Sequence, residues 1–350
     1  MKRQRPASLG IAPALCLLLM ASGCAQVDYY LQAARGQYQI VASREPVAEL
    51  LASPDTPETL RGQLSLANRM RSFATQHMAK DDLTGFTHYS DLGRSYAVWN
   101  VVAAPAYEME PKHWCFPVAG CVAYKGFFSE NSANEEAEGL RAEGYDVITY
   151  GVKAYSTLGW FADPLLNTFI HYGEPGLAAV IFHELAHQVV YVEDDSAFNE
   201  AFATAVEQTL LTKWLLEFGS PEQLQDLIER RRRHAEVTFL VLDFRNRLAL
   251  AYQGPDRESQ KQALFAELKR AYEKVTLAGE GTPYYDSWFQ RPLNNADLLS
   301  VATYYHLVPA FSELLHRNGG ELPAFFAAVR VLADKSPEDR ERSLLELMSE

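Results

Sequence analysis

The sequence predicts a mostly helical α+β fold with a small sheet in the N-terminal half. Strand-like stretches lie between residues 89 and 158, whereas from residue 176 onward apolar residues recur with the 3.6-residue period of helices. The chain has 350 residues, of which 48% are apolar and 22% are charged. Such a chain can bury a large hydrophobic core and is too apolar to be disordered. We therefore expect one large, mainly helical domain.

Residues 1–23 have the features of a secretory signal. Three basic residues precede an apolar run over residues 11–20, which is too short to cross a bilayer of ~30 Å as a stable helix. The run ends in Ala21-Ser22-Gly23-Cys24, which resembles the lipobox of bacterial lipoproteins and implies a lipid on Cys24. Because Ala25 follows rather than aspartate, the resemblance implies an outer-membrane location facing the periplasm. The alternative is an ordinary signal peptide with a chance cysteine.

The mature chain, without the signal, has fewer free cysteines and a more negative net charge than the full sequence. Cys16 leaves with the signal and Cys24 takes the lipid, so that Cys115 and Cys121 remain. In an oxidising compartment these two most simply pair as a local disulfide, because zinc ligation would favour a CxxC spacing. Loss of the three basic signal residues leaves 29 basic and 45 acidic residues, a net charge of −16. Such an acidic body repels nucleic acid, so no nucleic-acid partner is expected.

The elements of the mature chain can be placed in order. Residues 24–45 are expected to form the lipidated tether, and residues 46–350 the folded domain. Helical spacing covers residues 45–82, with a break at the two prolines of that stretch. β-Branched and aromatic residues predict three strands, over residues 89–104, 118–128 and 145–158, and a helix over residues 135–143. Further helices are predicted over residues 176–192, 196–218, 221–250, 256–278, 294–318 and 321–333.

The most informative stretch is His183-Glu184-Leu185-Ala186-His187, which lies in an uncharged run apart from its own glutamate. His183 and His187 are one helical turn apart, so both imidazoles can bind one ion. Glu184 lies about 100° around the helix axis, where it can hold a water beside the metal. Zinc lowers the pKa of such a water, and the carboxylate takes its proton and passes it to the leaving amine. The alternative is a pair of hydrogen-bonded core histidines.

A catalytic zinc site needs a third protein ligand. Twelve residues separate His187 from Glu200, which leaves room for a turn that returns a second helix beside the first. We expect Glu200 to be the third ligand. The Asn199-Glu200 pair resembles the gluzincin arrangement, although Thr204 stands where thermolysin-like enzymes have an aspartate that supports a ligand. Glu207, two turns beyond Glu200 on the same face, is the rival ligand or the group that orients a histidine.

Several segments occur in the order found in a bacterial family of zinc aminopeptidases that are lipoproteins. Besides the lipobox and the His-Glu-x-x-His motif, they are Tyr29–Gln32, Ala154–Trp160, Asn199–Phe202 and Asn294–Ala296. The chain resembles this family over nearly its whole mature length, which implies a zincin-like metallopeptidase domain. The sequence departs from well-known gluzincin aminopeptidases because it has no Gly-x-Met-x-Asn segment before the zinc helix. The strand predicted over residues 145–158 stands in its place and could pair with an extended peptide.

Peptide hydrolysis also needs a donor for the oxyanion besides zinc. The helix predicted over residues 294–318 offers Tyr304, Tyr305 and His306, of which we expect Tyr304 to be this catalytic donor. His171, shortly before the zinc helix, is a further candidate. An exopeptidase needs in addition a carboxylate that holds the α-amine of its substrate. The residues Glu193–Asp195 are candidates, unless they only form an acidic turn that caps the next helix.

These observations predict a zinc-dependent peptidase, by family resemblance an aminopeptidase, that acts on peptides in the periplasm. Two alternatives stay open. The first is a hydrolase of murein peptide cross-links, although the sequence has no recognisable murein-binding module. The second is a metal-stabilised lipoprotein that binds a partner without catalysis. The intact Glu184 argues against this second alternative.

Overall fold

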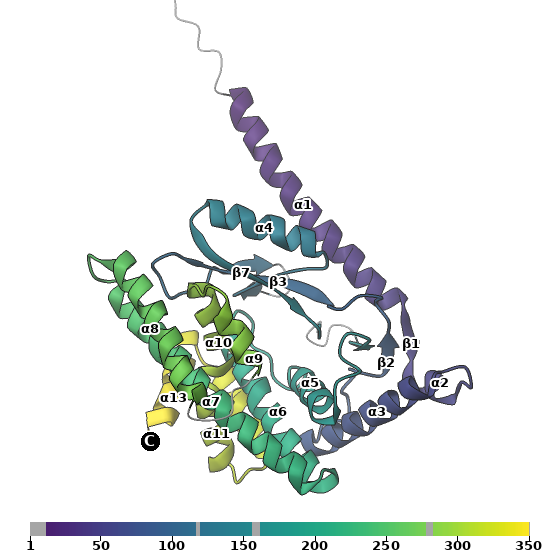
Figure 1. Ribbon diagram of the computed structural model, residues 1–350. Coiled ribbons are helices and arrows are strands. Elements are labelled where there is room, and N and C mark those ends of the chain that lie inside the picture. Colours follow the sequence, from purple (N-terminus) through teal and green to yellow (C-terminus); the bar gives the residue numbers. More distant parts are fainter. Residues whose placement is uncertain (1–11, 117–119, 156–161, 278–282, 350) are drawn as a thin grey trace, which may run out of the picture.

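The computed structural model describes residues 12–116, 120–155, 162–277 and 283–349. Figure 1 shows a mainly helical protein in which small sheets lie in the N-terminal half and helices form the rest. The predicted α+β, mostly helical fold is therefore confirmed. Among the described helices, none is both long and apolar enough to cross a membrane. The whole signal-like segment 1–23, the predicted lipid site Cys24, and residues 156–160 of the Ala154–Trp160 segment lie outside the residues whose side chains are described.

The described strands form three small sheets with the orders β1-β2-β8, β6-β3-β7 and β4-β5. The predicted strand regions are present but divided, since the stretch 89–104 contains the end of β2 and most of β3, and the stretch 118–128 contains β5 and β6. The third predicted strand, β7, ends at Val152. The bounds are β1 Arg44–Pro46, β2 His88–Ser90, β3 Val98–Pro105, β4 Trp114–Phe116, β5 Gly120–Val122, β6 Lys125–Phe127, β7 Tyr145–Val152 and β8 Leu165–Leu166.

The helices agree with the predicted spacing more closely. The predicted stretch 45–82 is α2 and α3, and the stretch 294–318 is divided into α10 and α11 because Pro309 opens the second helix. Helices α9 and α13 were not predicted. The bounds are α1 Ala12–Ala42, α2 Val47–Ala52, α3 Glu58–Met78, α4 Glu130–Ala142, α5 Glu174–Ala186, α6 Ser196–Phe218, α7 Pro221–Ala251, α8 Arg257–Leu277, α9 Pro283–Gln290, α10 Asn295–Tyr305, α11 Val308–Arg317, α12 Leu322–Ala333 and α13 Pro337–Ser349.

The sheet β6-β3-β7 separates two layers of the molecule. Successive side chains of a strand point to opposite faces. In β3, Val101 and Ala103 accordingly pack against α4 on one face. Val98 and Asn100 lie on the other face, where they line a cavity. Val102 on that same face packs beside the start of α10. The sheet is thus covered by α4 on one side and closes a cavity on the other.

Residues 24–45, expected as a tether, are helical as far as Ala42 and contact the body of the protein. Ile40 of α1 is buried in the main core. The Gln32 side chain accepts a hydrogen bond from the Phe128 backbone N–H at 2.9 Å. Gly36 passes so near the Phe128 ring that an added Cβ would lie 2.0 Å from it. Helix α1 is therefore packed on the body, although its N-terminal part projects beyond it (Figure 1).

The start of α10 is fixed by Asn295, which is fully buried. Its amide donates to the backbone carbonyls of Pro105, Ala106 and Glu108 at 3.1–3.2 Å, and its oxygen accepts from the Tyr252 hydroxyl at 2.7 Å. These bonds tie α10 to the end of β3. The Asn294–Ala296 segment thus positions the helix that carries Tyr304.

The substitution Asn295→Ala is expected to destabilise the protein by about 2–4 kcal/mol, because it leaves several buried polar groups without partners. Thermal unfolding of the variant and of the parent protein measures this. The neighbouring variant Ser300→Ala is the control, because Ser300 only bonds its own helix and should have little effect. Equal unfolding temperatures for parent and Asn295→Ala would contradict the assigned role.

Candidate active site

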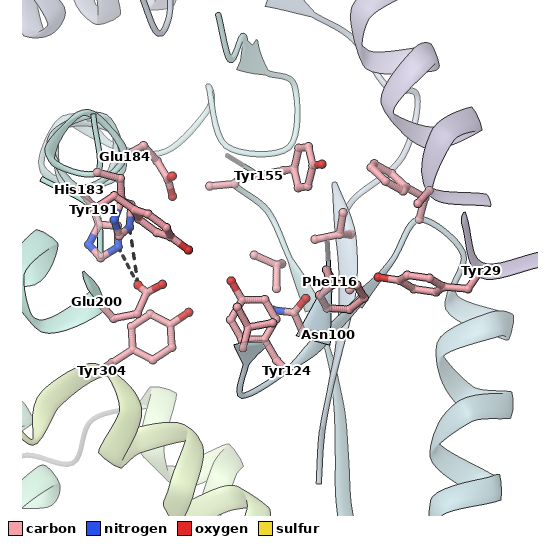
Figure 2. A pocket seen from close by; sticks show the side chains of 18 residues that line it. Tyr29, Asn100, Phe116, Tyr124, Tyr155, His183, Glu184, Tyr191, Glu200 and Tyr304 are labelled. Atoms are coloured by element: carbon pink, nitrogen blue, oxygen red, sulfur yellow. Dashed lines mark hydrogen bonds and ion pairs between the residues drawn. The ribbon is translucent and has the colours of Figure 1, made fainter. Parts of the chain in front are cut away.

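Helices α5 and α6 bring His183, His187 and Glu200 together (Figure 2). A carboxylate oxygen of Glu200 lies 3.2 Å from Nε2 of His183 and 3.8 Å from Nε2 of His187. The candidate ligand atoms of the three residues all lie within 4.8 Å of one another. These are the three residues for which the sequence predicts metal binding.

The donor set fits a zinc ion. Zinc binds histidine nitrogen and carboxylate oxygen at about 2.0–2.2 Å, so tetrahedral ligands are separated by about 3.3–3.6 Å. The two distances from Glu200 to the histidines bracket that range. Two neutral imidazoles and one carboxylate also leave a net negative charge, which favours a divalent cation. His183, His187 and Glu200 could therefore hold zinc after small adjustments of their side chains.

The turn between α5 and α6 is held by two polar side chains. Asn199, which is only 2% exposed, donates to the Val192 carbonyl at 2.6 Å and accepts from the Val192 N–H at 2.8 Å. Asp195 caps the N-terminus of α6 by accepting from the Phe198 N–H at 3.0 Å. Its second oxygen accepts from buried Arg340 of α13 at 2.8 Å. Together these bonds fix the helix that carries Glu200.

Charge and burial act in opposite directions on the two histidines. Burial lowers the pKa of His183, but the hydrogen bond and charge of Glu200 outweigh it and raise this pKa to about 9. Burial dominates at His187 and lowers its pKa to about 4. Burial raises the pKa of Glu200, yet the hydrogen bond from His183 and the two imidazoles bring it below its ordinary value. Without a metal, His183 and Glu200 therefore form a partly buried ion pair at neutral pH.

Glu207, the rival for third ligand, faces a different cavity. This second cavity, of about 350 Å³, lies between α6, α7 and α9, and Arg231, His234 and Tyr305 line it too. Burial raises the pKa of Glu207 although the charges of His183 and Arg231 oppose this. Within the described residues, Glu207 belongs neither to the candidate metal cluster nor to the cavity beside it.

The metal-site residues open into a cavity of about 360 Å³. Glu184 lines this cavity, and Figure 2 shows its carboxylate beside the histidines. Tyr304 of α10 lies on the opposite side of Glu200. The charge of Glu200 and burial raise the pKa of the Tyr304 hydroxyl well above its ordinary value. Tyr304 therefore keeps its proton and can donate a hydrogen bond into the cavity.

Two further tyrosines of the site were not predicted. Tyr124 follows β5 and Tyr191 follows α5, and both line the cavity with Tyr304. Burial first and then the charge of Glu200 raise the pKa of both hydroxyls. Tyr191 is four residues beyond His187, and this spacing could have identified it. Tyr124 is far from the motif in sequence, and no local signal indicates it.

The other predicted candidates do not line the cavity. His171 is exposed and its Nδ1 lies 3.0 Å from the Asn167 carbonyl oxygen. Asp194 accepts a hydrogen bond from the Cys121 backbone N–H, and Asp195 caps α6. None of the residues Glu193–Asp195 belongs to the described lining. These residues form the acidic turn before α6, which was the alternative to binding the α-amine of a substrate.

A disulfide-linked hairpin forms one side of the cavity. Cys115 and Cys121 are joined as predicted, directly opposite each other in β4 and β5. Gly120 in this hairpin has φ +70°, and an added Cβ would collide with Asp194. The hairpin thereby docks against the turn that follows α5 and carries Phe116 to the cavity.

The family model described as "Putative aminopeptidase" matches residues 28–344, from α1 to α13. The matched range contains every site residue named above. No curated protein and no solved structure matches the chain. The name of the family indicates a peptidase. The chain belongs to this "Putative aminopeptidase" family.

Proposed function

We propose that the protein is a zinc-dependent peptidase with a zincin-like site that hydrolyses peptides in the periplasm. In this proposal a lipid on Cys24 anchors it in the outer membrane. The observation that carries the enzymatic part is the convergence of His183, His187 and Glu200 beside Glu184 in one cavity. The lipid anchor and the location rest on the signal-like sequence before Cys24.

Each residue has a distinct task in this proposal. His183, His187 and Glu200 would hold the zinc ion, which lowers the pKa of water and polarises a carbonyl group. Glu184 accepts a proton from the attacking water and later delivers it to the leaving amine nitrogen. Tyr304 donates a hydrogen bond to the carbonyl oxygen as negative charge develops on it. Tyr124 and Tyr191 surround the same space with further neutral hydroxyls.

Removal of the metal tests the proposal directly. The purified mature protein should contain about one zinc ion per chain and should hydrolyse a mixture of peptides, as read by mass spectrometry. Treatment with a chelator should abolish hydrolysis, and added Zn²⁺ should restore it, while circular dichroism shows the fold in both forms. Undiminished hydrolysis by the metal-free protein would rule out a zinc peptidase. Stoichiometric zinc with no hydrolysis of any peptide would favour the non-catalytic alternative.

The substitution Tyr304→Phe is expected to lower kcat by about 10²- to 10³-fold, because it removes one donor to the developing oxyanion. Zinc content should not change, since Tyr304 is not among the three candidate ligands. Tyr305→Phe is the matched control, because Tyr305 is the next residue of α10 but lines the second cavity. Steady-state kinetics of the two variants give the answer. Similar small effects of both substitutions would exclude Tyr304 as the catalytic donor.

A further inference from the structure

Beyond the candidate metal-site residues, the site cavity is bounded by apolar side chains from several separate parts of the chain. In Figure 2, Tyr29 and Phe116 lie at the far end from His183, with Tyr124 and Asn100 between. Helix α1, the disulfide-linked hairpin and the ends of β6 and β7 all contribute. We call the part of the cavity at Tyr29 and Phe116 its apolar end. The other apolar residues of the lining include Ala33, Val122, Phe128 and Tyr155.

Charged groups occur only at the metal end of the described lining. Glu184 and Glu200 are its acidic residues, and it contains no lysine or arginine. A charged side chain of a substrate would therefore lose its hydration in the apolar end, where the described lining offers no charged partner, and this loss is costly. An apolar side chain would instead gain from leaving water.

The apolar end is formed before any substrate arrives. The rings of Tyr29 and Phe116 are stacked, with centroids 5.6 Å apart and planes 25° apart. The rings of Phe128 and Tyr155 meet edge to face at 5.3 Å. Helix α1 is seated by the Gln32 bond to Phe128 and by the close approach at Gly36 described above. The shape of this end is therefore set by the fold.

One neutral polar side chain lies between the two ends of the cavity. Asn100 of β3 is 5% exposed and lines the cavity. Its side-chain oxygen faces Gly126 of β6, where an added Cβ would lie 3.4 Å from it. An amide can both donate to a peptide carbonyl and accept from a peptide N–H. Asn100 thus offers a backbone-binding group next to a space that excludes charge.

We propose that the apolar end binds a bulky apolar side chain of the peptide, on a residue next to the scissile bond, while Asn100 hydrogen-bonds the peptide backbone. The substrate class is then peptides with an aromatic or large aliphatic residue at the cleavage position. This inference rests on the proposed peptidase function. Tyr29 and Phe116 determine the preference, because they lie farthest from His183 in Figure 2, together with Ala33, which lines the cavity one turn after Tyr29 on α1.

The first test is the preference of the zinc-loaded mature protein. Peptides of one length and sequence are compared in which only the residue next to the cleaved bond varies among Phe, Leu, Ala, Asp and Lys. We expect kcat/KM for Phe and Leu to exceed that for Asp and Lys by about 10- to 100-fold, which follows from the transfer of a large apolar side chain out of water. Equal or higher rates with Asp or Lys would overturn the inference and leave the peptidase function intact.

The second test fills the apolar end. Ala33 lines the cavity, whereas Ala34, the next residue of α1, is exposed to solvent. Ala33→Phe should lower kcat/KM for the Phe peptide by at least about tenfold while the Ala peptide loses little, because only a bulky side chain competes with the new ring for space. Ala34→Phe should leave both peptides unchanged. Zinc content and the unfolding temperature show that the variants are folded.

Three other results of these experiments are also informative. An Ala33→Phe variant that retains zinc and slows both peptides equally would overturn the inference, because a preference pocket predicts a selective loss. A smaller variant, Ala33→Leu, gives the same comparison if the phenylalanine prevents folding. If the zinc-loaded parent protein hydrolyses no peptide, the proposed function fails, and this inference fails with it.

Discussion

Replacing Glu184 with glutamine is expected to lower kcat by about 10²- to 10⁴-fold, the range that a positioned general base contributes. Glutamine has the shape of glutamate but cannot accept a proton from water at neutral pH. Glu184 lines the cavity without belonging to the candidate metal cluster, so zinc content should stay at the parent level. Kinetics and metal analysis of the same preparation measure both effects.

A matched substitution tests whether the loss is specific to Glu184. Glu193→Gln removes a carboxylate from the acidic turn, which does not line the cavity, and should keep parent activity. Turnover at the parent rate in Glu184→Gln would exclude Glu184 as the base. Loss of zinc from this variant would instead place Glu184 among the ligands and contradict the cluster described above.

The second large effect concerns the third metal ligand. Glu200→Gln keeps the size of the side chain but replaces a carboxylate with a neutral amide. Loss of a residue that only hydrogen-bonds a metal ligand lowers metal affinity by about 10- to 100-fold. Because Glu200 is expected to be a ligand itself, we expect Glu200→Gln to lower zinc affinity by more than this and to lower activity as well. Competition with a chelator of known affinity gives the change. The reason is geometric, because the Glu200 oxygen is the atom that lies close to both histidines.

Glu207→Gln is the matched control for this experiment. Glu207 is on the same helix two turns away but lines the second cavity. Its pKa is raised by burial, so a neutral side chain at this place should cost little. Zinc affinity should remain within about 100-fold of the parent even if Glu207 orients a histidine. The reverse pattern, with zinc lost in Glu207→Gln and kept in Glu200→Gln, would reassign the third ligand.

Features encoded by local spacing could be predicted from the sequence. The four-residue interval of His183 and His187 places both imidazoles on one face of α5 whatever the rest of the chain does. Helix α6 follows from the cap at Asp195 and a long apolar period, and its observed bounds are those predicted. The pairing of Cys115 with Cys121 could be predicted because only six positions separate them in the sequence.

Features that depend on distant contacts could not be predicted. Arg340 supports the cap of α6 from the last helix, and Tyr124 reaches the site from a hairpin whose docking depends on Asp194. No period or spacing in the sequence relates these residues to the zinc motif. The tether expected over residues 24–45 is a similar case, because this stretch is helical as far as Ala42 and contacts β6. Residue composition alone could not distinguish a tether from a packed helix there.

The packing of α1 has a mechanical consequence. Tyr29 lies five residues after Cys24, which is about 7.5 Å along a helix with a rise of 1.5 Å per residue. With a lipid on Cys24, as proposed, the segment at the bilayer and the far boundary of the substrate cavity belong to one stiff rod. The cavity of such an enzyme would be held at a fixed height and orientation above the membrane, whereas a flexible linker would allow many positions and orientations. A soluble version that begins at residue 46 would lack one side of its own substrate cavity.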